Sequence, residues 1–123
     1  MYLFDIFPTL CELLGKDIPK SVTGQSFLSC LNGEKQTSRD ELYLMYTDKI
    51  RALTKDGFKY IEHRYQGVTT RQLFDLNEDP HEMSNLVLNP NYQDKLSDMQ
   101  KKLKQQSEES NELNHQLGKN YWG

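Results

Sequence analysis

The stretch RQLFDLNEDPHEMSNL, residues 71–86, carries the pattern that decides the fold of this chain. Its first six residues place apolar, β-favouring side chains at Leu73, Phe74 and Leu76, which predicts a short strand over residues 71–76. Asp79 is placed as an N-cap and the next residue, a proline, suits the first helical position. Glu82 is placed to reach back as in a capping box. The stretch therefore predicts a strand that runs into a capped turn.

Three further strands are predicted upstream of this stretch. Residues 41–47 (ELYLMYT) are apolar on both faces, which predicts a helix over one face and another layer or domain over the other. Residues 50–54 and 58–63 flank Lys55-Asp56-Gly57, a clear hairpin signal. Residues 64–70 are predicted to be a loop.

A helix is predicted from residue 91 onward. One apolar stripe recurs at spacings of four and three, through Tyr92, Leu96, Met99 and Leu103. The stripe fails at Gln106 and Ser110, and the polar composition of residues 105–114 predicts a frayed helix or a loose tail. The fold class is therefore α+β: a four-stranded antiparallel sheet with a C-terminal helix packed on one face.

The start of the chain predicts a second helix, over residues 3–15, with Asp5 as its cap, Pro8 in its first turn and Gly15 at its end. Six apolar residues cover most of its circumference: Ile6, Phe7, Leu10, Cys11, Leu13 and Leu14. A helix of this kind belongs inside a larger protein. Residues 3–15 are therefore predicted to be part of something larger, or to self-associate. A short helix is predicted over residues 24–33.

Composition limits the class of protein. The chain has 123 residues, enough for one modest domain. Charged residues are 27% and the net charge is -3, which argues against a nucleic-acid or anionic-membrane surface. No apolar run approaches the roughly 18 to 20 residues that a membrane span needs. The 2 cysteines show neither a disulfide framework nor metal-ligand spacing.

The order Leu-Phe-Asp-Leu, two residues, Asp-Pro, then Glu, Asn and Leu resembles the C-terminal signature of the sulfatase family. Other residues fall at similar spacings: Asp5, Pro8-Thr9-Leu10, Gly15, Pro19, Gly24, Ser26, Leu31, Gly33, Arg51-Ala52, Thr54 and Lys59-Tyr60-Ile61. The resemblance implies that residues 1–33 are helices from the severed end of the family's large α/β domain. Residues 34–123 would then be its C-terminal subdomain with a polar tail, and the missing large catalytic domain would be its partner.

For the parent protein, the resemblance implies a sulfuric ester hydrolase of the alkaline phosphatase superfamily. Its nucleophile would be a formylglycine made in a Cys/Ser-x-Pro-x-Arg motif, and calcium would hold the sulfate. Cys11 and Cys30 do not lie in that motif, and no paired acidic metal ligands are present. We therefore expect no catalytic residue, metal ligand or cofactor in this chain, and no activity from it alone. A typical sulfatase would be periplasmic, secreted or lysosomal.

Arg51, Tyr46 and His63 are the candidates for the rim of the sulfate pocket, because the family's small domain can supply polar groups there. Arg is a natural partner for sulfate oxygens. The alternative is that Arg51 ties the hairpin to a neighbouring carboxylate or to the missing domain. His81, in the capped turn, and His115, in the polar tail, are predicted to have no ligand role.

Two other functions stay open at this point. The chain could be a free-standing interaction module that kept a sulfatase-like sheet. It could also be the same domain of a phosphate or phosphonate monoester hydrolase. The sequence upstream would discriminate, because a Cys/Ser-x-Pro-x-Arg motif there supports a sulfatase and an unmodified nucleophile supports a phospho-hydrolase.

Overall fold

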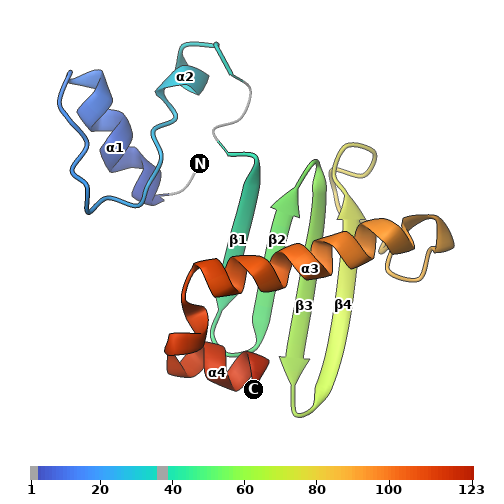
Figure 1. Cartoon of the computed structure of the whole chain (residues 1–123). Coiled ribbons are helices and arrows are strands. Elements are labelled where there is room, and N and C mark those ends of the chain that lie inside the picture. Colours follow the sequence, from blue (N-terminus) through green and yellow to red (C-terminus); the bar gives the residue numbers. More distant parts are fainter. Residues whose placement is uncertain (1–2, 36–38) are drawn as a thin grey trace. The chain divides into compact units, whose positions relative to one another are not determined.

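The computed structural model describes residues 3–35 and 39–123. The chain divides into two compact units, and the boundary between them along the sequence lies between Asp40 and Glu41. The first unit holds α1 (Leu3–Leu13) and α2 (Leu28–Leu31). The second holds the sheet and every later helix (Figure 1). The boundary predicted at residues 33–34 lies a few residues before this junction.

The second unit is built on a four-stranded antiparallel sheet in the order β1-β2-β3-β4, as the sequence predicts. Its strands are β1 (Glu41–Tyr46), β2 (Ile50–Lys55), β3 (Phe58–Tyr65) and β4 (Val68–Asp75). Two-residue turns with positive φ close two of the hairpins, at Asp56-Gly57 and at Gln66-Gly67. Such turns match the right-handed twist of the flanking strands. The predicted loop over residues 64–70 is therefore wrong, because most of it belongs to β3 and β4.

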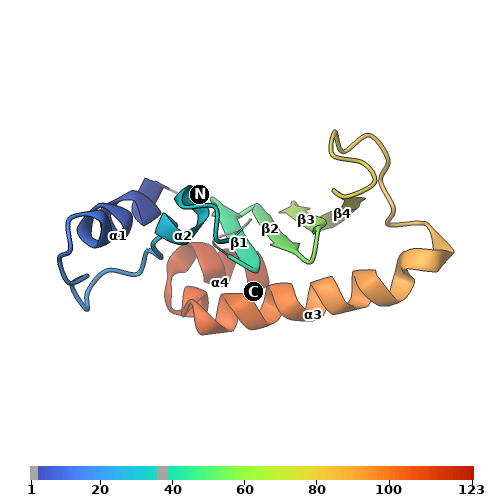
Figure 2. The same cartoon turned by 90° about the horizontal axis from the view of Figure 1, so that it is seen from above.

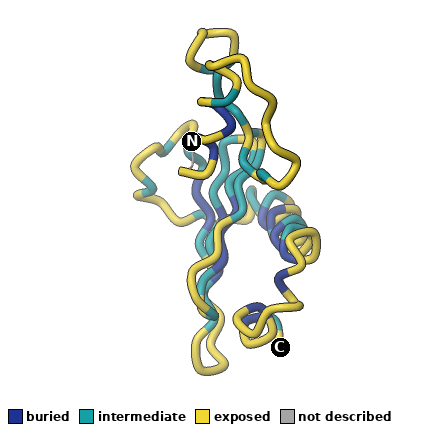
Figure 3. Tube along the Cα trace, turned by 90° about the vertical axis from the view of Figure 1, so that its left-hand side faces the viewer, coloured by how far each residue is buried: buried dark blue, intermediate teal, exposed yellow. Residues whose placement is uncertain are grey.

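The hydrophobic core lies between one face of this sheet and α3 (Gln93–Glu109). The buried stripe of α3 packs on three fully buried side chains of the sheet, Leu53, Tyr60 and Leu73. We call this side of the sheet the inner face and the opposite side the outer face. Figure 2 shows α3 and α4 on the same side of the sheet, and Figure 3 shows buried positions on the strands and along α3. The predicted helix packing is confirmed.

The capped turn predicted at residues 79–82 forms only in part. Asp79 caps the turn, since its carboxylate accepts a hydrogen bond from the Ser84 amide at 2.8 Å. Glu82 does not reach back to it. It takes a left-handed φ of 56° and binds the Lys59 ammonium at 2.7 Å instead. The capping-box prediction is wrong because a left-handed residue cannot continue a right-handed helical turn.

The end of the same stretch extends the sheet edge. The Asn85 side-chain oxygen accepts hydrogen bonds from the Leu73 amide at 3.0 Å and the Val87 amide at 3.2 Å. The Leu86 amide donates to the Leu73 carbonyl at 2.8 Å. Residues 85–87 therefore satisfy backbone groups of β4 that an edge strand would otherwise leave to water.

The loose tail predicted beyond Leu103 is wrong. Helix α3 continues to Glu109, and a left-handed turn at Asn111 leads into η2 (Glu112–Asn114) and α4 (Gln116–Trp122). Ser107, Glu112 and Tyr121 are all buried. Polar composition misled the prediction because the partners of these residues lie on distant strands, which a local window does not include.

In the first unit, Asp5 lies within α1 and is fully buried, so the prediction that it caps the helix is wrong. Its carboxylate accepts hydrogen bonds from the Gln25 amide at 2.8 Å and from Arg39 at 2.5 Å. The Thr9 hydroxyl accepts one from the Phe27 amide at 3.1 Å. These bonds fold the connector back along α1. The helix predicted over residues 24–33 is only the single turn of α2.

No helix in the described part of the chain is long and apolar enough to cross a membrane.

Candidate functional site

The outer face of the sheet brings two of the three candidate residues into one row. The strand register aligns Tyr46 with Ile50, Ile50 with His63, and His63 with Thr70. Neighbouring strands lie about 4.8 Å apart, so Tyr46 and His63, two strands apart, are separated by roughly 10 Å. A phenol and an imidazole at this separation can both reach one sugar-sized ligand.

Large apolar side chains lie exposed around this row. Leu44 is 41% exposed, Tyr46 68%, Tyr65 57% and Val68 63%. All four occupy outer-face positions, since they alternate with the residues that face α3. These residues form two exposed pairs, one on β1 and one where β3 and β4 pair, and exposed apolar residues on a sheet face are typical of an interaction surface. The outer face is therefore the candidate functional surface of this unit.

Arg51, the third candidate, lies on the inner face and is fully buried. Its Nε donates to Glu112 Oε1 at 2.6 Å, and its Nη1 donates to the carbonyls of Thr47 and Ile50 at 2.9 and 2.7 Å. Its guanidinium carbon lies 4.3 Å from the ring centre of Tyr121. The structure thus shows the alternative arrangement for Arg51, bound to a carboxylate within the domain and apart from Tyr46 and His63.

Glu112 holds the C-terminal segment to the sheet. Besides Arg51, the Tyr43 hydroxyl donates to its carboxylate, as does the Trp122 indole at 3.4 Å. Burial acts to raise the pKa of Glu112, but the hydrogen bonds from Arg51 and Tyr43 outweigh it, so that the pKa lies below its ordinary value. Burial and the bond to Glu112 raise the pKa of Tyr43. The carboxylate therefore stays ionised and the phenol stays neutral.

A second carboxylate, Glu62, gathers another cluster on the inner face. It accepts hydrogen bonds from Tyr60 at 2.6 Å, Arg64 at 2.8 Å, Tyr121 at 3.1 Å and Arg71 at 3.2 Å. Burial acts to raise its pKa, but the bonds from Tyr60 and Arg64 lower it below its ordinary value. Burial raises the pKa of Tyr60 and of Tyr121. This cluster fixes α4 through Tyr121.

Sequence reasoning missed both carboxylates. A signal for Glu62 was present, because period-two alternation places it on the same face as Tyr60, where an unpaired charge would be costly. Cross-strand register then pairs it with Arg51 and Arg71. Glu112 gives no such signal, because it lies in a polar stretch outside any predicted element.

The described residues offer no site for a metal. Residues 3–35 and 39–123 contain no group of three or more His, Cys, Asp or Glu side chains that could hold one. The calcium that the family resemblance implies for the parent enzyme would find no such group among these described residues. Cys11 and Cys30 are free and partly buried, and His81 and His115 are exposed.

Comparison with known proteins gives a consistent result. The family model described as N-sulphoglucosamine sulphohydrolase, C-terminal, matches residues 2–109. A Delta 4,5-hexuronate-2-O-sulfatase of Bacteroides thetaiotaomicron is 32% identical over 96 residues, which cover 72% of this chain and 20% of that protein. An arylsulfatase of Clostridium perfringens is 29% identical, over 80% of this chain and 21% of its own length. The chain thus spans about a fifth of the length of the curated relatives it matches.

Solved structures share the fold. That of a 2-O GAG sulfatase superposes with a TM-score of 0.71 and 28% identity, covering 89% of this chain and 25% of that chain. A phosphonate monoester hydrolase of Agrobacterium radiobacter superposes with a TM-score of 0.54 and 22% identity, covering 83% of this chain and 24% of that chain. The second likeness shows the fold alone.

Proposed function

This chain belongs to the N-sulphoglucosamine sulphohydrolase C-terminal family and is the C-terminal domain of a sulfatase, and from that premise we propose that its outer face packs against the catalytic domain of the parent enzyme. The single observation that carries the proposal is the exposure of Leu44, Tyr46, Tyr65 and Val68 on that face. Fully burying a large apolar side chain contributes about 1.5 to 3 kcal/mol, so covering this group would hold two domains together.

The proposal assigns Tyr46 and His63 to the rim of the substrate pocket. The Tyr46 hydroxyl and an imidazole N–H can each donate a hydrogen bond to a sulfate or hydroxyl oxygen of a sugar. Their shared row supports this role, because one ligand can reach both. They would orient the substrate and would not take part in bond cleavage.

Hydrolysis itself is proposed to use groups supplied by the rest of the enzyme. When present there, formylglycine supplies the nucleophile and calcium polarises the sulfate. Neither cysteine of this chain lies in the Cys/Ser-x-Pro-x-Arg motif, and the described residues contain no group of three or more His, Cys, Asp or Glu side chains that could hold a metal. Its contribution is therefore to shape and close one side of the pocket.

The alternatives are less well supported. The fold is shared with a phosphonate monoester hydrolase, but at 22% identity that likeness carries no chemistry. The relatives found by sequence are sulfatases, and the family match covers most of the chain. A free-standing interaction module is not favoured for the same reason.

The proposal can be tested in the full-length enzyme with Tyr46→Phe and His63→Gln. Loss of one hydrogen bond, about 0.5 to 1.5 kcal/mol, should lower kcat/KM for a sugar sulfate by roughly 2- to 13-fold. A small aryl sulfate, which does not reach the rim, should be turned over at an unchanged rate. His81→Gln, on the exposed turn, is the matched control. Equal losses on both substrates, or none on either, would contradict the rim assignment.

A further inference from the structure

β1 forms one edge of the sheet, and the side of this strand that faces away from β2 pairs with no other strand of the unit. We propose that an extended segment of the parent enzyme's catalytic domain pairs with this edge and adds a strand to the sheet. The inference rests on the proposed docking of the two domains and names the kind of element that the catalytic domain contributes. Addition of a strand to a sheet edge is a common mode of recognition, because the backbone itself supplies the hydrogen bonds.

The register of the sheet fixes which backbone groups of β1 lie on the free edge. The Arg64 amide donates to the carbonyl of Lys49, directly before β2, at 2.8 Å, so the odd-numbered residues of β2 direct their backbone groups to β3. The even-numbered residues of β2 therefore bond to β1, and their register partners there are also even-numbered. The N–H and C=O groups of Tyr43 and Met45 consequently point away from the sheet.

The opposite edge strand, β4, has its outward groups bound. The same alternation directs the backbone groups of Leu73 away from β3, and Asn85 and Leu86 bind them there. β1 has no such cover, because within residues 41–123, all of which the structure describes, no residue binds the edge groups of Tyr43 and Met45. The sequence of β1, ELYLMY, also lacks the lysine, proline or bulge that usually keeps an edge strand from pairing. β1 is therefore open to another strand.

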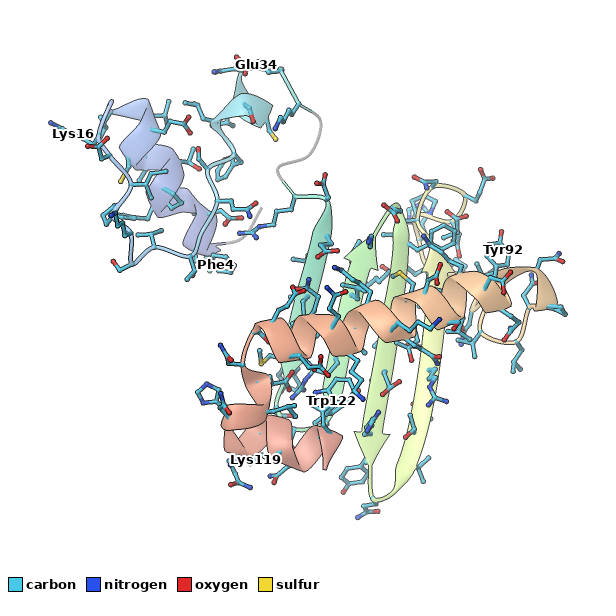
Figure 4. All side chains as sticks on the ribbon, in the orientation of Figure 1. Phe4, Lys16, Glu34, Tyr92, Lys119 and Trp122 are labelled. Carbon is cyan, nitrogen blue, oxygen red and sulfur yellow. The ribbon has the colours of Figure 1, made fainter. Side chains whose placement is uncertain are left out.

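Exposed apolar side chains flank this edge on both faces of the sheet. Leu44 and Tyr46 are exposed on the outer face. On the inner face Met45 is 51% exposed, although α4, which carries Trp122 (Figure 4), lies on the same side of the sheet. A domain packed over the outer face alone would leave Met45 in water. A strand beside β1 would pack against all three side chains, and it should itself carry apolar residues on both faces.

The catalytic domain is the expected source of the added strand. The described residues of the first unit, 3–35 and 39–40, contain no strand. The chain spans about a fifth of the length of its curated relatives, so most of such an enzyme lies outside it. A segment of the same polypeptide acts at an effective concentration of about a millimolar, whereas a second copy would have to reach that concentration in solution. A short edge offers few hydrogen bonds, which favours the intramolecular partner.

Hydrogen exchange resolved to single residues tests the pairing. The amides of Tyr43 and Met45 should exchange fast in the 123-residue chain and roughly tenfold or more slowly in the full-length enzyme. The Leu44 amide, which faces β2, is the internal control and should be protected in both. The chain is measured at several concentrations, so that pairing with a second copy would appear as protection that rises with concentration.

A proline variant separates pairing from simple shielding. Met45→Pro removes one outward N–H, at an edge position where the ladder to β2 does not need it. In the full-length enzyme it should return the Tyr43 amide to the exchange rate of the chain alone. Met45→Val keeps the N–H and suits a strand, so it should keep the protection. Circular dichroism of the 123-residue chain would verify that both variants fold.

Three outcomes would overturn the edge pairing. One is equally fast exchange of Tyr43 and Met45 in the chain and in the full-length enzyme. Another is protection that appears in the chain alone as its concentration rises, which would mean a second copy. The third is Tyr43 protection that Met45→Pro leaves unchanged, which would mean shielding without pairing.

The docking of the outer face has its own readout. Hydroxyl-radical footprinting should show the Tyr46 side chain shielded in the full-length enzyme, in the parent sequence and in Met45→Val. A shielded Tyr46 with fast-exchanging edge amides would overturn the edge pairing and leave the docking. An accessible Tyr46 with protected edge amides would overturn the outer-face docking and leave the edge pairing.

Discussion

The guanidinium of Arg51 in β2 binds the carboxylate of Glu112, 61 residues later in the chain, and both side chains are buried. This pair joins the middle of the sheet to the segment after α3. Two ionised groups in a dry interior are tolerated only when both are paired and their remaining donors and acceptors are satisfied. Arg51 meets that condition through two backbone carbonyls, and Glu112 through Tyr43 and Trp122.

Replacing Arg51 should destabilise the domain strongly. Arg51→Ala leaves Glu112 buried without its cation, which typically lowers the free energy of unfolding by about 3 to 5 kcal/mol. Urea denaturation at neutral pH measures this. Arg71→Ala is the control, because Arg71 is 43% exposed and such pairs contribute about 0 to 1 kcal/mol. Similar losses for the two variants would contradict the assignment of Arg51 to a buried structural pair.

Acid should weaken the domain through Glu112 and Glu62. Both pKa values lie below the ordinary 4.5 in the folded state. A lowered folded pKa contributes stability that is complete above the unfolded pKa and is lost as the pH falls through the folded one. The free energy of unfolding should therefore hold from neutral pH to about pH 5 and then fall.

Glu112→Gln separates this effect from general acid denaturation. The variant should be less stable at neutral pH and should lose less stability below about pH 5, since one titrating group is gone. Glu109→Gln, at the exposed end of α3, should follow the parent curve. A Glu112→Gln curve parallel to the parent curve through the acid range would show that Glu112 has no part in it.

Gly118→Ala should displace α4. A Cβ at this position would lie 2.2 Å from the carbonyl oxygen of Glu112, too close for any real contact. Alanine favours a helix over glycine by about 1 kcal/mol, but such overpacking costs typically 1 to 3 kcal/mol, so the net effect should be destabilising. Trp122 emission should shift to the red as the indole meets water. Asn120→Ala, exposed on the same helix, is the control, and a stabilised Gly118→Ala would refute the close packing.

The parts of the fold that the sequence predicts are those set by neighbouring residues. Asp56-Gly57 closes the β2–β3 hairpin through its own positive φ values, and the α3 stripe follows from helical spacing. Gln66-Gly67 forms the same kind of turn. The polar residues around this turn predict a loop instead, although threonine suits a strand.

The candidate site also has features that local sequence patterns predict and features that they do not. Once the hairpin register is known, Tyr46 and His63 share a face by period-two alternation alone. The place of Arg51 on the opposite face follows from the same alternation, but its partner does not. Glu112 is distant in sequence and lies in a polar stretch, so no local pattern marks it as buried. Sequence periodicity cannot predict which charged residues pair when they are far apart in the chain.

The chain alone should not hydrolyse sulfate esters. The described residues hold no candidate metal cluster, and neither cysteine lies in the nucleophile motif. Incubation with an aryl sulfate and calcium should release no product above buffer. A sulfatase of known activity serves as the positive control. Turnover that depends on calcium and survives repurification would show that the chain carries catalytic groups of its own.

The exposed stripe of α1 should make the chain self-associate. Leu3, Phe7 and Leu10 of α1, with Leu14 directly after its end, recur at helical spacing and are 50% to 84% exposed. The buried residues of α1 are Asp5, Pro8 and Thr9. Each large side chain that a second copy covers would contribute up to about 1.5 to 3 kcal/mol. The average mass from light scattering should therefore rise with protein concentration.

Substitution of that stripe tests whether α1 is the contact. Phe7→Ser combined with Leu10→Ser removes two of its apolar side chains, at a helix-propensity cost of only a few tenths of a kcal/mol each. The double variant should stay monomeric at concentrations where the parent chain associates. Glu12→Gln, a polar exposed position on the same helix, should associate as the parent does. A mass that is independent of concentration in the parent, or association unchanged in the double variant, would show that this stripe does not bind a second copy.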